Sequence, residues 1–331
     1  MDDQHSTITR LRLRECEDFL ALVPYLLGYQ PQEQLVFVVV DDARIGLTGA
    51  MPLNALEAPE PARESLVGAV DNFENPMVLL ACWCDSAELA QTALGLAEVW
   101  LGPERVLDSV HVDAHHWHSR LGGGAGRHGS REELDHRAVV AQAVVAGLSH
   151  CPSREGAVAV AQGPEAEDVP RLERILLDAE DALGIIGWDE WQRRAGRLQV
   201  EMLGEADQDW SAEDCALLAV LSGDELTRDD LCLALGRRNA AKAEALWGRV
   251  VMGCPPHWAT GPLLMLGFSA WLNGNGAVLV ACIERAHALG DRSDLLACLD
   301  GINRQAVPPS AWEQVRGAEV FGVGAGMGGA A

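Results

Sequence analysis

Positive charge is scarce in this 331-residue chain, which has 25 lysine and arginine residues, 49 aspartate and glutamate residues and a formal net charge of −24. Lys242 is its single lysine. The excess of acidic residues is similar in both halves of the chain. Residues 1–160 have 11 basic and 23 acidic side chains, and residues 161–331 have 14 basic and 26 acidic side chains. Nonspecific binding to nucleic acid or to anionic lipid needs basic groups that neutralise phosphate. We therefore expect neither a nucleic-acid nor a membrane partner.

Long apolar stretches are also missing. The longest runs have roughly ten residues, about half of what a membrane-spanning helix needs. The first residues, Met-Asp-Asp-Gln-His-Ser, contain no apolar core of the kind found in a signal peptide. These two features predict a cytoplasmic protein.

Cysteine is present, but not in a pattern that predicts disulfides. The nine cysteines are an odd number, widely scattered, and most lie inside apolar runs, which is typical of reduced core residues. Cys82-Trp83-Cys84 is a C-x-C sequence without a second pair at zinc-ribbon spacing. We expect both of its thiols to pack in the core, with a redox or metal role as the alternative.

Catalytic motifs are absent as well. The chain contains no G-x-S-x-G elbow, no H-E-x-x-H helix and no EF-hand loop. The glycine run at 122–126 leads into Arg127-His128 and lacks the Gly-Lys-Ser/Thr ending of a phosphate-binding loop. The sequence therefore favours a non-catalytic protein without a cofactor.

What is present is a clear change of pattern near residue 163. Before it, buried or alternating apolar runs predict strands at 35–40, 45–51, 78–83 and 105–113. Helical spacing separates several of them, at 14–27, 62–72, 85–100 and 137–148. We predict an α/β domain at residues 1–163, with a mixed, largely parallel sheet between flanking helices. The Gly-rich segment 121–135 is expected to be a mobile loop.

After residue 163 only helical patterns occur. They predict an all-helical domain at 164–316, with helices at 169–183, 188–203, 212–221, 227–235, 239–252, 262–272, 277–289 and 293–303. Ser211, Thr227 and Ser293 are the expected N-caps of three of these helices. The Gly/Ala-rich end, 317–331, is expected to be a flexible tail.

A histidine-rich segment follows the last predicted strand of the first half. If the chain stays extended through residue 115, then His111, Asp113 and His115 share one face, and His116 and His118 lie on the other. Two imidazoles and a carboxylate make a weak candidate site for zinc or non-haem iron. Solvated histidines beside a glycine loop are the simpler interpretation, and a metal site is not favoured.

Several segments occur in an order that resembles a known family. They are Glu17 to Val40 with Pro24, Leu26-Leu27-Gly28 and Pro31, then Val112-Asp113 with Trp117 and Ser119, Ala138 to Glu155, Thr227-Arg228-Asp229, Leu246-Trp247, Pro262 to Ala286, and Pro308 to Trp312. The chain thus resembles the actinobacterial domain-of-unknown-function family 4192 over roughly residues 15–315. This resemblance implies a fold family and an actinobacterial host, without a function. Members usually have other residues at 115, 116 and 118, which further weakens the metal hypothesis.

Two functional hypotheses remain open. The first is a non-catalytic binding or scaffold protein that docks a protein partner or a second copy of itself, through tryptophans of the kind that anchor interfaces, namely Trp188, Trp191, Trp210 and Trp258. The alternative is a small-molecule-binding protein or enzyme with a site between the α/β and helical halves. Its predicted ligand-binding residues are Asp113, Trp117, Arg228, Asp229, Glu284 and Arg285.

Overall fold

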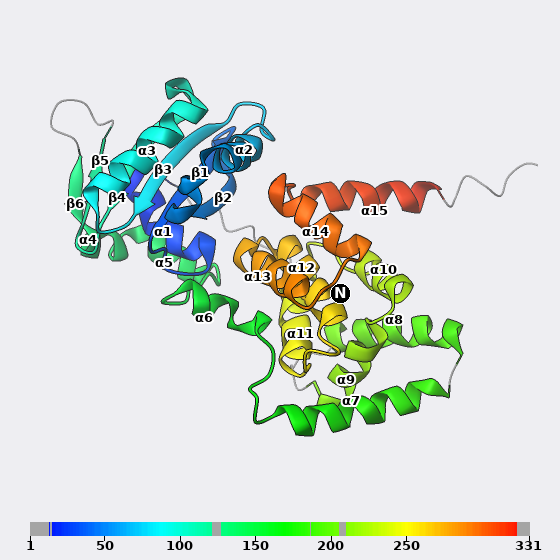
Figure 1. The fold of residues 1–331 in the computed structure, drawn as a ribbon. Helices are drawn as coiled ribbons and strands as arrows, with labels where there is room; N and C mark the ends of the chain where they lie inside the picture. Colours follow the sequence, from blue (N-terminus) through cyan, green and yellow to red (C-terminus); the bar gives the residue numbers. More distant parts are fainter. Residues whose placement is uncertain (1–12, 14, 121–126, 186, 205–209, 323–331) are drawn as a thin grey trace, which may run out of the picture. The chain divides into compact units, whose positions relative to one another are not determined.

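A computed structural model describes residues 13, 15–120, 127–185, 187–204 and 210–322 of the chain (Figure 1). The chain folds into two compact units, Met1–Ala157 and Val158–Ala331. Each unit has a hydrophobic cluster of its own. The predicted domain organisation, with its boundary at 163–164, stays a prediction.

The first unit is built on a six-stranded sheet with the order β2-β1-β3-β4-β5-β6. Its strands are β1 Gln34–Asp41, β2 Arg44–Pro52, β3 Met77–Trp83, β4 Val106–Val112, β5 His116–Ser119 and β6 His128–Ser130. The first four correspond to the predicted strands, and β1 and β2 form a hairpin. The short strands β5 and β6 extend the sheet beyond those four.

The prediction of a largely parallel sheet is wrong. Of the five neighbouring pairs, β3–β4 is parallel and the others are antiparallel. The helical crossover before β3 starts from β2, so β3 runs in the direction of β2 but pairs with β1. Since β1 and β2 are antiparallel, β3 is antiparallel to its neighbour as well. The sequence showed the crossover but not which strand would become the neighbour.

Helices pack against both sides of this sheet. They are α1 Cys16–Leu27, α2 Pro59–Val70, α3 Ala87–Leu101, α4 Arg131–Asp135, α5 Ala138–Val145 and α6 Arg154–Val158, with short 3-10 turns η1 Leu53–Glu57 and η2 Pro103–Arg105. Residues of α1, α4 and α5 share a hydrophobic cluster with alternate strand residues such as Val36, Ala81 and Val112. Helix α3 packs against β3 and β4. We call the side that carries Val36, Ala81 and Val112 the α1 side of the sheet.

One local prediction in this unit needs correction. The segment 121–135 is not a loop throughout, because 128–130 pair as β6 and Ser130 caps α4, where Leu134 is 3 % exposed. Residues 121–126 lie outside the described part. Helix α1 continues through Pro24 to Leu27 and the left-handed C-cap Gly28 at φ 78°, in agreement with the predicted helix at 14–27.

The described residues of the second unit form helices only. They are η3 Ala159–Ala161, α7 Val169–Gly184, α8 Trp188–Gly204, α9 Ala212–Leu221, α10 Glu225–Leu233, α11 Ala240–Met252, α12 Thr260–Asn273, α13 Gly276–Ala288, α14 Asp294–Arg304 and α15 Ser310–Gly322. All eight predicted helices are present, and Ser211 and Ser293 are caps as expected.

Two details of the second unit differ from prediction. The cap of α10 is Asp224 rather than Thr227, which is buried inside the helix. Helix α15 covers residues 317–322 of the expected flexible tail, and residues 323–331 lie outside the described part. No helix within the described ranges has both the length and the apolar run that a bilayer crossing requires.

Candidate functional site

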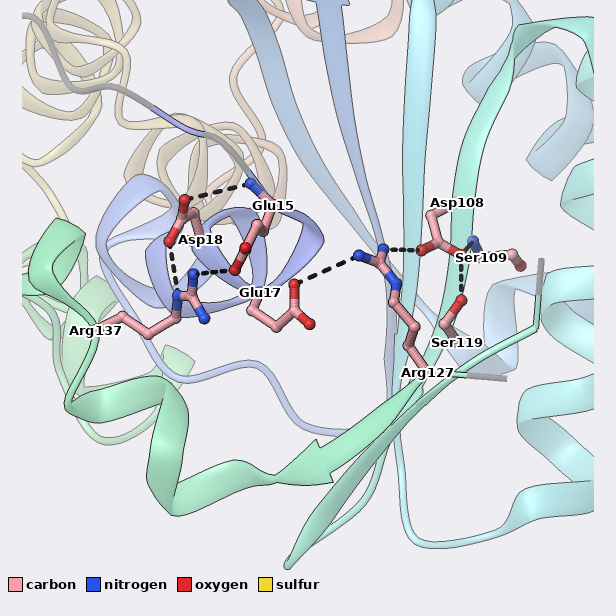
Figure 2. Close-up of polar contacts among 8 residues, drawn as sticks. All are labelled: Glu15, Glu17, Asp18, Asp108, Ser109, Ser119, Arg127 and Arg137. Atoms are coloured by element: carbon pink, nitrogen blue, oxygen red, sulfur yellow. Dashed lines mark hydrogen bonds and ion pairs between the residues drawn. The ribbon is translucent and has the colours of Figure 1, made fainter. Parts of the chain in front are cut away.

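A buried carboxylate organises the α1 side of the sheet near β4. Asp108 of β4 is 6 % exposed. Its Oδ1 accepts hydrogen bonds from the backbone N–H of Ser109 at 2.8 Å and from the hydroxyl of Ser119 at 2.7 Å. Its Oδ2 lies 3.1 Å from Nη2 of Arg127, immediately before β6 (Figure 2). Asp108 therefore joins β4, β5 and the start of β6 through one side chain.

Helix α1 supplies the other side of this cluster. Glu17 Oε2 lies 3.8 Å from Nη1 of Arg127, and the neighbouring Cys16 thiol is buried close to Asp108. Burial, followed by the negative charge of Asp108, raises the pKa of Cys16 far above that of a free thiol. A thiol held protonated is a poor nucleophile. The cluster is thus an ion-pair and hydrogen-bond network rather than an activated cysteine site.

A second arginine holds the beginning of α1. Arg137 donates from Nε to Asp18 Oδ1 and from Nη2 to Glu15 Oε2, both at 2.6 Å (Figure 2). Asp18 is 7 % exposed and also accepts from the backbone N–H of Glu15 in a capping box. Arg127 and Arg137 therefore anchor the acidic first turn of α1 to the segment that follows residue 126.

Asp113 and Trp117, two of the predicted ligand-binding residues, have structural roles in this unit. Asp113 Oδ1 accepts from the backbone N–H groups of His115 and His116, both at 2.7 Å, and so closes the turn between β4 and β5. Burial raises the pKa of Asp113, but these two hydrogen bonds and nearby histidines outweigh it, and the net shift is downward. Trp117 is 4 % exposed and packs in the core on the α1 side.

The predicted facing of the histidines is wrong. Strand β4 ends at Val112, and the chain reverses at Asp113 instead of continuing to His115. His111 therefore pairs with His118 of β5 and shares its face of the sheet. Within the described ranges, no three histidine, cysteine or acidic side chains are arranged around one position where a metal ion would fit.

The cysteines behave as core residues. All nine are free, and seven of them are buried. The Sγ atoms of Cys82 and Cys84 lie 3.7 Å apart, and burial raises the pKa of both thiols. The expectation that both thiols of the C-x-C pair pack in the core is confirmed, since Cys82 and Cys84 are buried.

The second unit contains a pocket of about 550 Å³. It forms where α10, α12 and α14 begin, with α7, α8 and the end of α9 completing its wall. Its polar and aromatic lining includes Glu180, Trp191, Arg228, His257, Trp258 and Asp291. Its volume falls within the range of about 300–1,000 Å³ that is usual for small-molecule sites, although its lining is more polar than that of most of them.

Arg228 forms part of the wall of this pocket. It is 5 % exposed, and its Nη1 donates to the carbonyl oxygens of Ser222 and Gly223 at 3.0 and 3.1 Å. Its Nη2 lies 3.7 Å from Glu225 Oε1. Because Ser222 is the C-cap of α9, the guanidinium meets the negative end of that helix. Arg228 therefore fixes the shape of the pocket with most of its donors already engaged.

The charged side chains of the lining are four carboxylates, those of Glu180, Asp224, Glu225 and Asp291, and one guanidinium, that of Arg228. Asp224 accepts the Thr227 N–H at the start of α10, and Asp291 accepts the Ser293 N–H at the start of α14. Both acids thus offset the positive ends of helices. Glu225 is paired with Arg228. Glu180 is therefore the one lining carboxylate that neither a helix start nor Arg228 offsets.

Glu180 lies against a tryptophan. Its Oε1 accepts from the indole N–H of Trp258 at 2.7 Å. The indole N–H of Trp191 donates to the carbonyl of Leu183 at 3.0 Å. Both indole N–H groups are therefore engaged within the protein and are not free to donate to a ligand.

The remaining predicted site residues lie elsewhere in the second unit. Asp229 and Glu284 are exposed side chains that do not line this pocket. Arg285 is partly buried and donates to the carbonyl of Ala161 at 2.6 Å, which ties α13 to η3. Burial lowers the pKa of Arg285. Arg228 is thus the one predicted ligand-binding residue at the pocket.

The predicted interface tryptophans indicated the pocket better than the predicted ligand-binding residues did. Trp191 and Trp258 line the pocket, whereas Trp210 is 8 % exposed and belongs to the core. The side chain of Trp188 lies outside the described part. Glu180, His257 and Asp291 were missed, because they carry no motif and come from segments far apart in the sequence.

Comparison with known proteins gives one match. The family model described as a domain of unknown function, DUF4192, matches residues 17–310. No curated protein and no solved structure matches the chain. Since the matched range covers most of the 331 residues, this chain belongs to the DUF4192 family.

Proposed function

We propose that this protein is a non-catalytic binding protein whose helical unit receives a cationic group in the pocket beside Glu180. The observation that supports this proposal most directly is the hydrogen bond between Glu180 and Trp258 at the pocket wall. It places a carboxylate beside an aromatic ring, and both groups attract cations. The net charge of −24 adds a long-range attraction for cations.

A basic side chain of a protein partner is the cation that we favour. An arginine or lysine inserted from another protein fits the hypothesis of tryptophan-anchored docking, since Trp191 and Trp258 are the rings that it would contact. A free organic amine has the same chemistry and is the second source. The proposal places this activity in the cytoplasm of an actinobacterial cell.

Calorimetric titration of the full chain tests the site. N-acetyl-arginine amide and tetramethylammonium represent the two sources, and N-acetyl-aspartate is the anionic control. We expect the two cations to bind and the anion not to bind. Stronger binding of an arginine-containing peptide than of tetramethylammonium supports the protein partner, and the reverse order supports a small amine.

Two variants locate the binding. Glu180→Gln removes the charge but keeps an acceptor for Trp258, and should weaken cation binding about tenfold, which corresponds to roughly 1.4 kcal/mol. Glu173→Gln, on the same helix and exposed, is the matched control and should bind like the unaltered chain. Equal weakening in both variants, or tighter binding of the anion, would contradict the proposal.

A further inference from the structure

Helix α10 has an exposed apolar stripe. Leu226 and Leu233 are 58 % and 40 % exposed. They lie seven positions apart, which is close to two helical turns, so both side chains project from the same side of α10. The opposite side is buried and holds Thr227, Arg228, Leu231 and Cys232. In the described part of the chain, the packing of α10 therefore uses one side of the helix and leaves the side with the two leucines exposed.

An acidic side chain flanks this stripe on each side. Asp229 lies three positions after Leu226, Asp230 lies three positions before Leu233, and both aspartates are exposed. Residues three or four positions apart are neighbours on a helix surface. Neither aspartate forms an ion pair with another residue in the described ranges. The two leucines are thus bordered by negative charge that no ion pair offsets.

The stripe begins beside the pocket of the helical unit. Glu225, the residue before Leu226, lines the pocket, and 69 % of its side chain is accessible. With a rise of about 1.5 Å per residue, Leu233 lies roughly 10 Å farther along α10 than Leu226. Neither leucine lines the pocket. Pocket and stripe are therefore adjacent surfaces with different chemistry, a cavity that attracts cations and an apolar row bordered by acids.

We propose that the stripe and the pocket together bind one basic amphipathic helix of a protein partner, an inference that rests on the function proposed for the pocket. Apolar side chains of that helix pack against Leu226 and Leu233. Its arginine or lysine side chains face Asp229 and Asp230, and one further basic side chain enters the pocket beside Glu180. Residues i and i+7 of the partner helix have the same spacing as the two leucines of α10, so two turns of it cover the stripe.

Charge decides which partner fits this surface. The aspartates beside the stripe and the net charge of −24 repel an acidic helix and attract a basic one. An uncharged helix would desolvate the two carboxylates without giving them a partner, which is costly. A free amine fills the pocket alone and leaves the leucines exposed. The stripe therefore favours a protein segment over a small amine as the occupant.

Calorimetric titration of the full chain with a designed peptide provides the test. The peptide has about 18 residues, which is long enough to form a helix, with leucines at i, i+3, i+4 and i+7 spacing on one face and arginines on the other. A scrambled peptide of the same composition has no apolar face. We expect the amphipathic peptide to bind roughly tenfold more tightly than the scrambled peptide and than N-acetyl-arginine amide, because it alone contacts both stripe and pocket.

Variants assign the contacts. Leu226→Gln and Leu233→Gln should each weaken binding of the amphipathic peptide about threefold to tenfold. Both should leave the binding of N-acetyl-arginine amide unchanged, since neither side chain lines the pocket. Met252→Gln is the matched control, because Met252 of α11 is 50 % exposed and lies outside the pocket lining. The double variant Asp229→Asn, Asp230→Asn should weaken the peptide several-fold at low salt and less at high salt.

The outcomes separate this inference from the function proposed for the pocket. Equal binding of the scrambled peptide, or leucine variants that bind like Met252→Gln, would overturn the partner helix. Peptide binding that Glu180→Gln leaves unchanged would also overturn it, because the stripe would then act without the pocket. If N-acetyl-arginine amide binds and the amphipathic peptide binds no more tightly, the pocket function stands and the partner helix is wrong. If N-acetyl-arginine amide does not bind, the pocket function itself is wrong.

Discussion

The indole N–H of Trp247 on α11 donates to the side-chain oxygen of Gln199 on α8 at 3.1 Å, and both residues are fully buried. The amide nitrogen of Gln199 donates in turn to the carbonyl of Leu231 on α10 at 3.0 Å. One buried amide therefore satisfies polar atoms of two other helices. Because buried polar atoms that lose their partners are costly, this amide is a point on which the packing of the helical unit depends.

Gln199→Leu should destabilise the protein by about 2–4 kcal/mol, because it leaves one buried donor and one buried acceptor without partners. Urea unfolding followed by far-ultraviolet circular dichroism measures the change. Gln142→Leu, at an exposed position of α5, should change stability by less than about 0.5 kcal/mol. Similar values for the two variants would show that the Gln199 hydrogen bonds contribute little.

Arg137→Met should also lower the free energy of unfolding. The substitution keeps much of the side-chain volume but removes the cation from Asp18, a buried residue in the first turn of α1. Arg137 is itself partly exposed, with 28 % of its side chain accessible, so we expect a loss of about 2–3 kcal/mol, less than for a fully buried pair.

The control for Arg137 is an exposed pair. Arg63 and Glu60 are one turn apart on α2, with 45 % and 77 % of their side chains accessible. Arg63→Met should change the free energy of unfolding by less than about 0.5 kcal/mol. An Arg137→Met variant as stable as Arg63→Met would show that Asp18 does not need its cation.

The elements of the fold could be predicted from sequence because their signals are local. Apolar periodicity located the four longer strands and the eight helices of the second half, and Ser211 and Ser293 marked two of the helix starts. Strand neighbours depend on contacts that such patterns do not contain. The same run of residues that predicts β3 is compatible with pairing to β1 or to β2, and this choice decided the direction of the sheet.

The candidate sites were harder to predict for the same reason. Asp18 and Arg137 are 119 positions apart, and Glu180 and Trp258 are 78 positions apart. The histidines were visible in the sequence, but their shared face follows from a turn closed by the Asp113 carboxylate. Because Asp113 closes this turn with two hydrogen bonds to backbone N–H groups, His118 lies on the same face of the sheet as His111 and not on the opposite one.

The stability of the helical unit should fall as pH rises through the titration of Glu244. Its carboxylate is hydrogen-bonded to the side-chain amides of Asn273 and Asn275, both at 2.7 Å. Burial nevertheless raises the pKa of Glu244 above its ordinary value, although these two bonds oppose the shift. The folded state then binds the proton more tightly than the unfolded state.

The sign of the effect follows from proton linkage. Stability is greatest below the unfolded pKa of Glu244 and decreases as pH rises from that value through the raised folded pKa. Glu244→Gln removes this titration, so the stability of the variant relative to the unaltered chain should increase with pH across that window. Urea unfolding at several pH values measures the trend, and parallel curves for the two proteins would contradict it.

Two glycines on helices should respond to alanine in opposite directions. Gly196 lies inside α8, and a Cβ atom there would have nothing within 4 Å. Alanine is the better helix former, so Gly196→Ala should stabilise the protein by up to about 1 kcal/mol. Gly261 lies at the start of α12, where a Cβ atom would come within 2.3 Å of the carbonyl oxygen of Ser222.

Gly261→Ala should therefore destabilise the protein by about 1–3 kcal/mol despite the better helix propensity, because a backbone atom must move to make room. Ser222 is also the residue whose carbonyl accepts from Arg228, so the displacement acts on the wall of the pocket. We expect Gly261→Ala to weaken cation binding as well as stability, whereas Gly196→Ala should leave binding unchanged. Thermal unfolding and the N-acetyl-arginine amide titration measure the two effects, and a stabilised Gly261→Ala variant would show that α9 and α12 do not approach as closely as their backbones indicate.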